Sequence, residues 1–250
     1  EQGRAVGVRL ANGERLEAAR GVIANTSPWD LLALLPEPAV PSRWRRRQAA
    51  TPACASFLHW HLALRGDDLD HLPIHHVWVG DWERGIGAER NMVVLSMPSR
   101  LDPSCAPAGH QVLHGYTPAN EPWEIWQGLE RGSAAYGALK QERCAVFGTA
   151  LDRVLPDWRE RVVLERQGTP LTHRHYLRMH QGSYGPAWPA NAGPFPGGST
   201  PVEGLVLCGA GVFPGIGVPP VAVSGAMAAH RFVGARQQRQ LLEEIGLTAG

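Results

Sequence analysis

Glycine residues are concentrated in one segment, LVLCGAGVFPGIGVPPVAVSG, that begins at residue 205. An apolar run typical of a strand precedes these glycines, and a run of small residues typical of a helix follows them. Without side chains, a ligand can approach the backbone closely, and the first N–H groups of the helix, near Val218 to Val221, would add a partly positive site. The spacing predicts a site for a phosphate or the electron-rich edge of a flavin ring, although packing of a tight strand-to-helix connection explains it equally well. The glycines of the turn are Gly209, Gly211, Gly215 and Gly217, and Gly225 lies in the helical run that follows.

Histidine is the second residue type whose spacing could support chemistry. His59 and His61 are two positions apart in a predicted strand and would share one face, and His173 and His175 flank an arginine. No HExxH motif is present, and no carboxylate follows at ligand spacing. We therefore expect no metal site, and we expect His59 and His61 on the solvated or cavity-facing side of a sheet.

A hydrolytic nucleophile is not indicated either. Ser183 and Ser224 lack the GxSxG setting of a strand-to-helix nucleophile turn, and Cys208 falls in a predicted buried strand. No catalytic residue is assigned from the sequence.

The composition excludes several classes of protein. A chain of 250 residues with 44% hydrophobic composition can bury a substantial core, and a net charge of +1 does not suggest a nucleic-acid surface. The basic segment from Arg43 to Gln48 suits a solvated helix face or a contact with anionic lipid headgroups.

The four cysteines are far apart and form no CxxC pair, so a disulfide scaffold or zinc ribbon is not expected and a reducing cytoplasm fits. No run reaches the about 18 apolar residues of a transmembrane helix, and no signal peptide is recognised. The chain begins with Glu1 rather than methionine, so we expect it to be cut from a longer protein.

Local patterns predict several strands and helices. Residues 4–18 alternate in polarity around Asn12-Gly13, a dipeptide that favours a hairpin turn. Residues 21–25 indicate a short buried strand, and Ser27 followed by Pro28 is a typical helix start. Strands of an antiparallel sheet are expected at residues 54–64, 74–80, 91–99 and 111–119.

A long helix is predicted from Ser133 to Leu155, because apolar residues recur there at helical spacing and Pro156 ends it. Residues 162–170 then read as an extended segment, and residues 170–200 as loop-rich. The two ends of the chain are alike and the middle differs, which predicts a middle domain inserted into a split first domain.

Three segments resemble a known family of flavoproteins. GAGVFPGIGVPPVAVSG (209–225) resembles the C-terminal flavin motif of the phytoene desaturase and carotenoid isomerase superfamily. GTPLTHRHYLRMHQGSYGP (168–186) and SRLDPSCAPAGHQVLHGYT (99–117) are similar to segments of the carotenoid cis–trans isomerases, or prolycopene isomerases. The opening hairpin and VIANTSPW also fit, so the resemblance covers nearly all of the chain.

The resemblance implies the fold class: α/β (α+β), the C-terminal part of a two-domain, FAD/NAD(P)-binding Rossmann-type flavoprotein with an inserted mixed sheet-and-helix substrate domain. The expected boundaries are 1–30 and 171–235 for the FAD-binding domain, 31–170 for the substrate-binding domain, and 236–250 for a C-terminal tail. The N-terminal dinucleotide-binding segment would be missing from this chain.

The resemblance also implies site residues. FAD would contact a set of residues at two chain segments: Asn25, Thr26, Gly209, Ala210, Gly215, Gly217, Val218 and Val221. His173, Tyr176 and Tyr184 would line the substrate cavity. Isomerases of the family usually carry Gly-Asp where this chain has Gly209-Ala210, and the desaturase branch often has Gly-Ala-Gly, as here.

The expected function is therefore FAD-dependent chemistry on a carotenoid or related polyene, with cis-to-trans isomerisation promoted by reduced flavin. A desaturase or a retinol-saturase-like reductase is the alternative within enzymes. A non-catalytic module that binds a hydrophobic ligand or a partner subunit is the alternative of another class. We expect a cytoplasmic protein without nucleic-acid partners, and peripheral membrane contact is inferred only from the apolar substrate.

Overall fold

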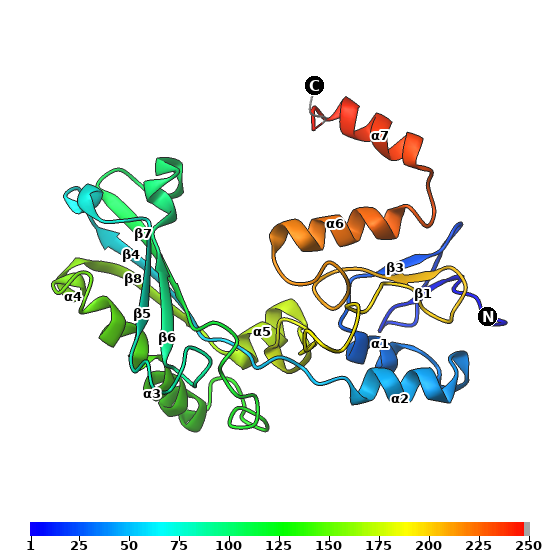
Figure 1. Cartoon of the computed structure of the whole chain (residues 1–250), viewed down its shortest axis with the longest axis horizontal. Coiled ribbons are helices and arrows are strands. Elements are labelled where there is room, and N and C mark those ends of the chain that lie inside the picture. Colours follow the sequence, from blue (N-terminus) through cyan, green and yellow to red (C-terminus); the bar gives the residue numbers. More distant parts are fainter. Residues whose placement is uncertain (248–250) are drawn as a thin grey trace. The chain divides into compact units, whose positions relative to one another are not determined.

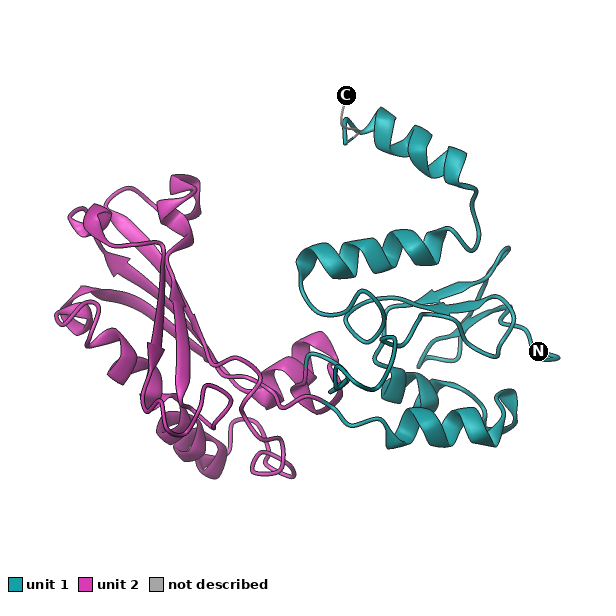
Figure 2. Ribbon diagram, in the orientation of Figure 1, with its two compact units in different colours: residues 1–53, 184–250 teal, residues 54–183 magenta. Residues whose placement is uncertain are grey.

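The two ends of the chain fold together into one unit, and the middle of the chain forms another (Figure 2). The structure, a computed structural model, describes residues 1–247. Unit 1 comprises Glu1–Ala53 and Tyr184–Gly250, and unit 2 comprises Cys54–Ser183. The units thus divide at residues 53/54 and 183/184, not at 30/31 and 170/171 as expected from the sequence.

Packing explains why the expected boundaries were displaced. Leu31 and Val40 are buried in an apolar cluster with Leu205 and Leu207, so the segment after residue 30 belongs to unit 1. Leu171 is buried in the core of unit 2, so the segment after residue 170 stays with that unit. Burial of apolar side chains, and not the change of pattern along the chain, sets both boundaries.

Unit 1 contains two small sheets. Strands β1 (Gly7–Arg9) and β2 (Arg15–Glu17) form the hairpin predicted around Asn12-Gly13. Strand β3 (Val22–Ala24) pairs in parallel with β9 (Leu205–Leu207), although 180 residues separate them along the chain. The helices of unit 1 are α1 (Pro28–Leu34), α2 (Ser42–Ala50), α6 (Val218–Ala229), α7 (Ala235–Glu244) and the 3₁₀ turn η1 (Glu37–Ala39).

Side chains satisfy backbone groups at both ends of helix α1. The Ser27 hydroxyl accepts a hydrogen bond from the Asp30 N–H at 3.0 Å, which caps α1. At the other end of α1, the Arg45 guanidinium of α2 donates to the carbonyls of Leu32 (3.0 Å) and Leu35 (3.2 Å). One arginine of the basic segment is therefore structural, because it satisfies carbonyls that have no partner within α1.

Unit 2 is built on a five-stranded antiparallel sheet in the order β5-β6-β7-β4-β8 (Figure 1). Its strands are β4 (His59–Arg65), β5 (His75–Val79), β6 (Met92–Ser96), β7 (His110–Tyr116) and β8 (Val162–Gly168). Its helices are α3 (Ala134–Leu151), α4 (Trp158–Arg161) and α5 (Pro170–Leu177). The 3₁₀ turns are η2 (Leu69–His71), η3 (Pro98–Arg100), η4 (Pro103–Cys105) and η5 (His180–Gly182). The antiparallel sheet and the long helix predicted from the sequence are both confirmed.

The two faces of this sheet differ in chemistry. On β4, Trp60, Leu62 and Leu64 are at most 2% exposed and lie in the main core. The Trp60 ring stacks on Phe147 of α3, with ring centroids 5.7 Å apart, so α3 covers this face. The alternate residues of β4, among them His59 and His61, occupy the opposite face because strand side chains alternate.

The two ends of unit 2 are held close together. The Ser56 hydroxyl donates to the Gly182 carbonyl at 2.6 Å, within unit 2. In unit 1, the Ala187 N–H donates to the Pro52 carbonyl at 2.8 Å. The chain therefore leaves unit 1 and returns to it at neighbouring points.

Three local predictions were wrong. Residues 170–177 form helix α5 and not an extended or loop-rich segment, because Thr169 and Thr172 make a capping box and Pro170 fits the first turn. Residues 235–244 form helix α7 rather than a tail. Strand β3 is not buried throughout, since Ile23 is 44% exposed in a sheet of only two strands. Among residues 1–247, no helix has both the length and the apolar character needed to cross a membrane.

Candidate functional site

The parallel pairing of β3 and β9 brings two predicted cofactor segments together at the carboxyl ends of the strands. The Cys208 N–H donates to the Ala24 carbonyl at 3.1 Å, which places Asn25 directly beside Gly209. Gly209 has φ of +99°, and a Cβ at this position would lie 2.3 Å from the Asn25 Oδ1. Only glycine fits here, because the backbone is left-handed and the space is already occupied. Carboxyl ends of parallel strands are the usual ligand edge of an open α/β sheet.

A buried serine fixes the turn that follows β9. The Ser224 hydroxyl, from α6, accepts from the Gly209 N–H at 2.8 Å and donates to the Val221 carbonyl at 2.7 Å. Ser224 is 2% exposed, so both bonds are shielded from water. Ser224, which the sequence did not suggest as a nucleophile, therefore has a structural role. It attaches the glycine turn to the first turns of α6.

The start of α6 offers fewer donors than the sequence suggested. Gly217 is the N-cap, with φ of +116° and no side-chain cap. The Val221 N–H donates to the Gly217 carbonyl at 3.0 Å, so the prediction of a free donor there is wrong. Pro219 and Pro220 have no N–H at all. Within this first turn, the backbone N–H of Val218, a residue that is 81% exposed, is the donor still available to a ligand.

Two features of this edge suit a ring with a hydroxylated chain. The Thr26 Oγ1 is buried without a hydrogen-bond partner, and buried hydroxyls without partners are uncommon. Beyond it, Phe213 and Ile216 of the turn are 50% and 43% exposed. Gly215, buried in the turn, has φ of +108° and donates its N–H to the Val212 carbonyl at 2.9 Å. The edge thus combines an unsatisfied hydroxyl with an exposed apolar rim.

The three predicted substrate residues lie in different units. His173, on α5 of unit 2, is 7% exposed and its ring lies 4.1 Å from the Phe57 ring. Tyr176 is 68% exposed, and the Arg131 guanidinium lies 4.9 Å from its ring centroid. Tyr184 belongs to unit 1. Their joint role in one cavity stays a prediction.

Four histidines gather on the face of the unit 2 sheet opposite α3. The register places His61 of β4 directly opposite His114 of β7. The His114 ring stacks on His61 and His59 with centroids 4.7 and 4.8 Å apart, and the His59 Nδ1 lies 2.7 Å from the His114 Nε2. His173 approaches from α5, with its ring centroid 4.9 Å from that of His59.

Burial keeps these imidazoles neutral at pH 7. It lowers the pKa of His59 to about 2, and His173, His114 and His61 add to this shift. Burial, with a contribution from His61, also lowers the pKa of His114 to about 4. The pKa of His173 falls to about 4 for the same main reason, although a hydrogen bond to the Phe57 backbone opposes the shift.

Sequence reasoning recognised that His59 and His61 share a face but missed His114. Strand register decides which histidine lies opposite His61, and no local pattern reports it. The three ligand nitrogens of His59, His61 and His114 lie within 4.8 Å of one another. The expectation that the chain has no metal site rested on motif spacing alone.

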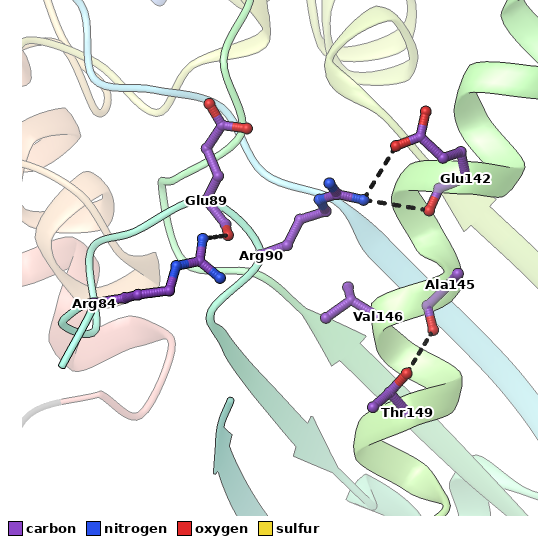
Figure 3. Close-up of a pocket in the computed structure, with 7 residues that line it drawn as sticks. All are labelled: Arg84, Glu89, Arg90, Glu142, Ala145, Val146 and Thr149. Carbon is purple, nitrogen blue, oxygen red and sulfur yellow. Dashed lines mark hydrogen bonds and ion pairs between the residues drawn. The ribbon is translucent and has the colours of Figure 1, made fainter. Parts of the chain in front are cut away.

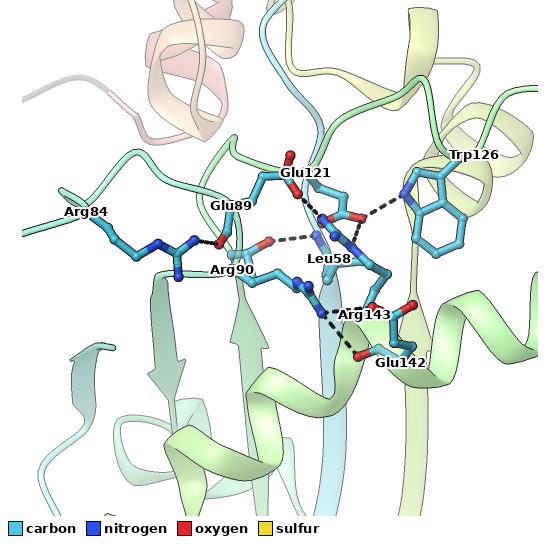
Figure 4. Close-up of polar contacts among 9 residues, drawn as sticks. Leu58, Arg84, Glu89, Arg90, Glu121, Trp126, Glu142 and Arg143 are labelled. Atoms are coloured by element: carbon cyan, nitrogen blue, oxygen red, sulfur yellow. Dashed lines mark hydrogen bonds and ion pairs between the residues drawn. The ribbon is translucent and has the colours of Figure 1, made fainter. Parts of the chain in front are cut away.

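A buried ion pair, which the sequence did not single out, supports the same unit (Figure 4). Arg143 of α3 donates from Nε (2.9 Å) and Nη2 (2.8 Å) to the two oxygens of Glu121, whose side chain is 0% exposed. The Trp126 indole donates to the same carboxylate at 2.8 Å. Burial lowers the pKa of Arg143, but its bonds to Glu121 and Glu89 outweigh this effect and raise it.

A pocket of about 570 Å³ lies beside this pair in unit 2, and the predicted site residues do not line it (Figure 3). In it, Arg90 donates to the Glu142 carboxylate at 3.3 Å and Arg84 to the Glu89 carbonyl at 3.1 Å. Its charged rim does not suit a long hydrocarbon. Its lining residues are Arg84, Glu89, Arg90, Glu142, Ala145, Val146 and Thr149.

The elements and sheets define a mixed α/β protein. An oxidoreductase from Methanosarcina mazei superposes with a TM-score of 0.57 at 19% sequence identity, over 92% of this chain and 47% of that one. This similarity concerns the fold alone. No family model matches the chain.

Curated proteins identify the family more closely. The chain is 35% identical over 253 residues to the chloroplastic prolycopene isomerase of Daucus carota, across 97% of this chain and 40% of that protein. It is 27% identical to the neurosporene-forming phytoene desaturase of Rhodobacter capsulatus, across 91% of this chain and 45% of that protein. These similarities fit the carotenoid isomerase and desaturase superfamily, and the chain spans less than half the length of these relatives.

Proposed function

We propose that this chain is part of an FAD-dependent enzyme that acts on a carotenoid or related polyene, and that the reaction is cis-to-trans isomerisation. The observation that carries the proposal is the edge formed by Asn25, Thr26 and Gly209, where two segments distant in sequence meet. Similarity to prolycopene isomerases over nearly the whole chain supports the choice of reaction.

The residues of this edge fit the cofactor in specific ways. Gly209 allows Asn25 to lie close against the turn, and the Thr26 Oγ1 is available to exchange a hydrogen bond with a hydroxyl of the ribityl chain. The exposed side chain of Asn25 offers both a donor and an acceptor. Ala210 supplies backbone groups only, and Gly215, Gly217 and Val218 would allow the turn to follow the ring.

When bound in its reduced form, FAD would supply the electron density that weakens a double bond of the polyene enough for rotation. The protein's contribution is to bind, orient and exclude water. His173, neutral because of its burial, and Tyr176, both in unit 2, would line the substrate cavity without adding charge. A hydrocarbon offers no polar group to recognise, so shape and apolar contact would select it.

The second candidate is a desaturase or a reductase of the same superfamily. The observation in its favour is Ala210, which provides no carboxylate where isomerases of the family usually have aspartate. Desaturation removes two hydrogens from the polyene and needs an electron acceptor, whereas saturation adds two hydrogens and needs a donor. Isomerisation leaves the composition unchanged.

The test uses the chain within its complete open reading frame, purified and incubated without oxygen with prolycopene, in one series with reduced FAD and in a parallel series with oxidised FAD and a quinone as electron acceptor. A product of unchanged mass and altered retention supports isomerisation. A product lighter or heavier by two hydrogens supports the redox alternative. Purified protein without flavin absorbance, and without product when FAD is added, would contradict both and favour a binding module.

A further inference from the structure

We propose that His59, His61 and His114 bind a divalent transition-metal ion, with the Nε2 of His173 as a fourth nitrogen ligand. The site lies wholly within unit 2, on the sheet face opposite α3. This proposal does not depend on the glycine turn or the flavin, but it gives His173 a role as a metal ligand in place of the uncharged substrate-cavity role described above.

The strand geometry brings the ligands to metal-binding spacing. His59 and His61 alternate along β4 and point to one face, and His114 lies opposite His61 on β7. The three ligand nitrogens lie within 4.8 Å of one another. Bonds of about 2.0–2.1 Å to a tetrahedral zinc ion would place them about 3.3 Å apart, so the rings would have to rotate and approach one another when the ion binds.

His173 provides the second, separate observation. His173 is only 7% exposed, and its Nε2 has no hydrogen-bond partner. The ring also hydrogen-bonds to the backbone of Phe57. Histidines that bind metals typically donate their other ring N–H to a backbone carbonyl or carboxylate in this way, which fixes the tautomer and leaves Nε2 as the ligand.

A hydrogen bond between histidines does not account for the whole cluster. The 2.7 Å contact from the His59 Nδ1 to the His114 Nε2 satisfies one nitrogen of each ring. The His59 Nε2 is still buried without a partner, as is the His173 Nε2. The rings of His59 and His173, with centroids 4.9 Å apart, therefore each carry one buried nitrogen to which no hydrogen bond is assigned.

The ligand set indicates which ions fit. All the members of the cluster are imidazoles, which suit zinc, copper, iron and nickel, whereas magnesium and calcium prefer oxygen ligands. His61 is exposed, so an ion can reach the site from solvent.

The experiment uses the untagged full chain, stripped with a chelator and dialysed. Zn²⁺ is added, and bound metal is measured by elemental analysis and titration calorimetry; Co²⁺ is used in parallel for the visible absorption of a four-coordinate site. We expect one ion per chain. His61→Ala removes an exposed ligand, and it should weaken binding by more than the about 10–100-fold typical of changes beyond the direct ligands.

The matched control is His75→Ala, an exposed histidine on β5 of the same sheet. It should bind Zn²⁺ as the unmodified chain does. His173→Gln, with folding checked by circular dichroism, should bind more weakly and change the Co²⁺ spectrum. The proposal is overturned if the unmodified chain binds less than one tightly held ion, if His61→Ala binds as well as the unmodified chain, or if His75→Ala loses as much affinity.

Discussion

Replacing Arg143 with methionine should destabilise unit 2 strongly, because it isolates a buried carboxylate. Glu121 accepts three hydrogen bonds, two from Arg143 at 2.8 and 2.9 Å and one from Trp126 at 2.8 Å. After the substitution, the Trp126 indole is the one of these donors that still bonds to the Glu121 carboxylate, whose side chain is 0% exposed. Breaking one partner of such a pair costs about 3–5 kcal/mol. With an m-value of about 2 kcal/mol/M, the urea midpoint falls by about 2 M.

The assay is urea unfolding of the full chain, followed by tryptophan fluorescence and circular dichroism. Arg90→Met is the control, because Arg90 pairs with Glu142 at 3.3 Å and Glu142 is 63% exposed. Such a pair contributes at most about 1 kcal/mol. The double variant Arg143→Met/Glu121→Met removes both charges and should recover most of the loss. Equal midpoints for Arg143→Met and Arg90→Met would refute the reasoning, as would a double variant less stable than Arg143→Met.

Three further predictions concern other positions. Gly209→Ala should destabilise unit 1, because a Cβ would lie 2.3 Å from the Asn25 side-chain oxygen and the left-handed backbone adds about 1–3 kcal/mol of strain. The control is Gly197→Ala, where a Cβ would meet no atom within 4 Å, and it should change the urea midpoint little. Ser224→Ala should cost about 1–3 kcal/mol in the same assay, because the buried backbone N–H that it serves loses its partner; an unchanged midpoint would contradict this. Burial raises the pKa of Cys144 to about 12, so it stays a neutral thiol at pH 8 and should react with a thiol reagent only after unfolding, while exposed Cys105 reacts at once. Peptide mapping of the labelled cysteines checks this, and rapid labelling of Cys144 in the folded chain would be inconsistent with its burial.

Local signals in the sequence predicted much of the fold. Asn12-Gly13 gave the hairpin because its residues tolerate the turn conformation, and Ser27 gave the start of α1 because its hydroxyl caps the first turn. Ser133 does the same for α3, accepting from the Tyr136 N–H at 3.2 Å. Such features depend on residues within one turn of each other, so a single sequence contains them. The capping box at Thr169 was equally readable and was overlooked.

The site depends on contacts that no local pattern reports. The approach of Asn25 to Gly209 requires β3 to pair with β9, and the approach of His114 to His61 requires one particular strand register. Val221 was expected to donate to a ligand, but its N–H serves Gly217 within the helix. The resemblance to a family indicated the segments expected to bind the cofactor, whereas hydrogen bonding decides which of their groups stay available.

The neighbouring ends of unit 2 have a consequence for how such proteins diversify. Ser56 bonds to Gly182 on one side of the junction, and Ala187 bonds to Pro52 on the other. An inserted segment whose ends lie together can be lengthened, shortened or exchanged as a cassette by recombination without separating the strands that flank it. Changes within unit 2 therefore need not disturb the pairing of β3 with β9 in unit 1.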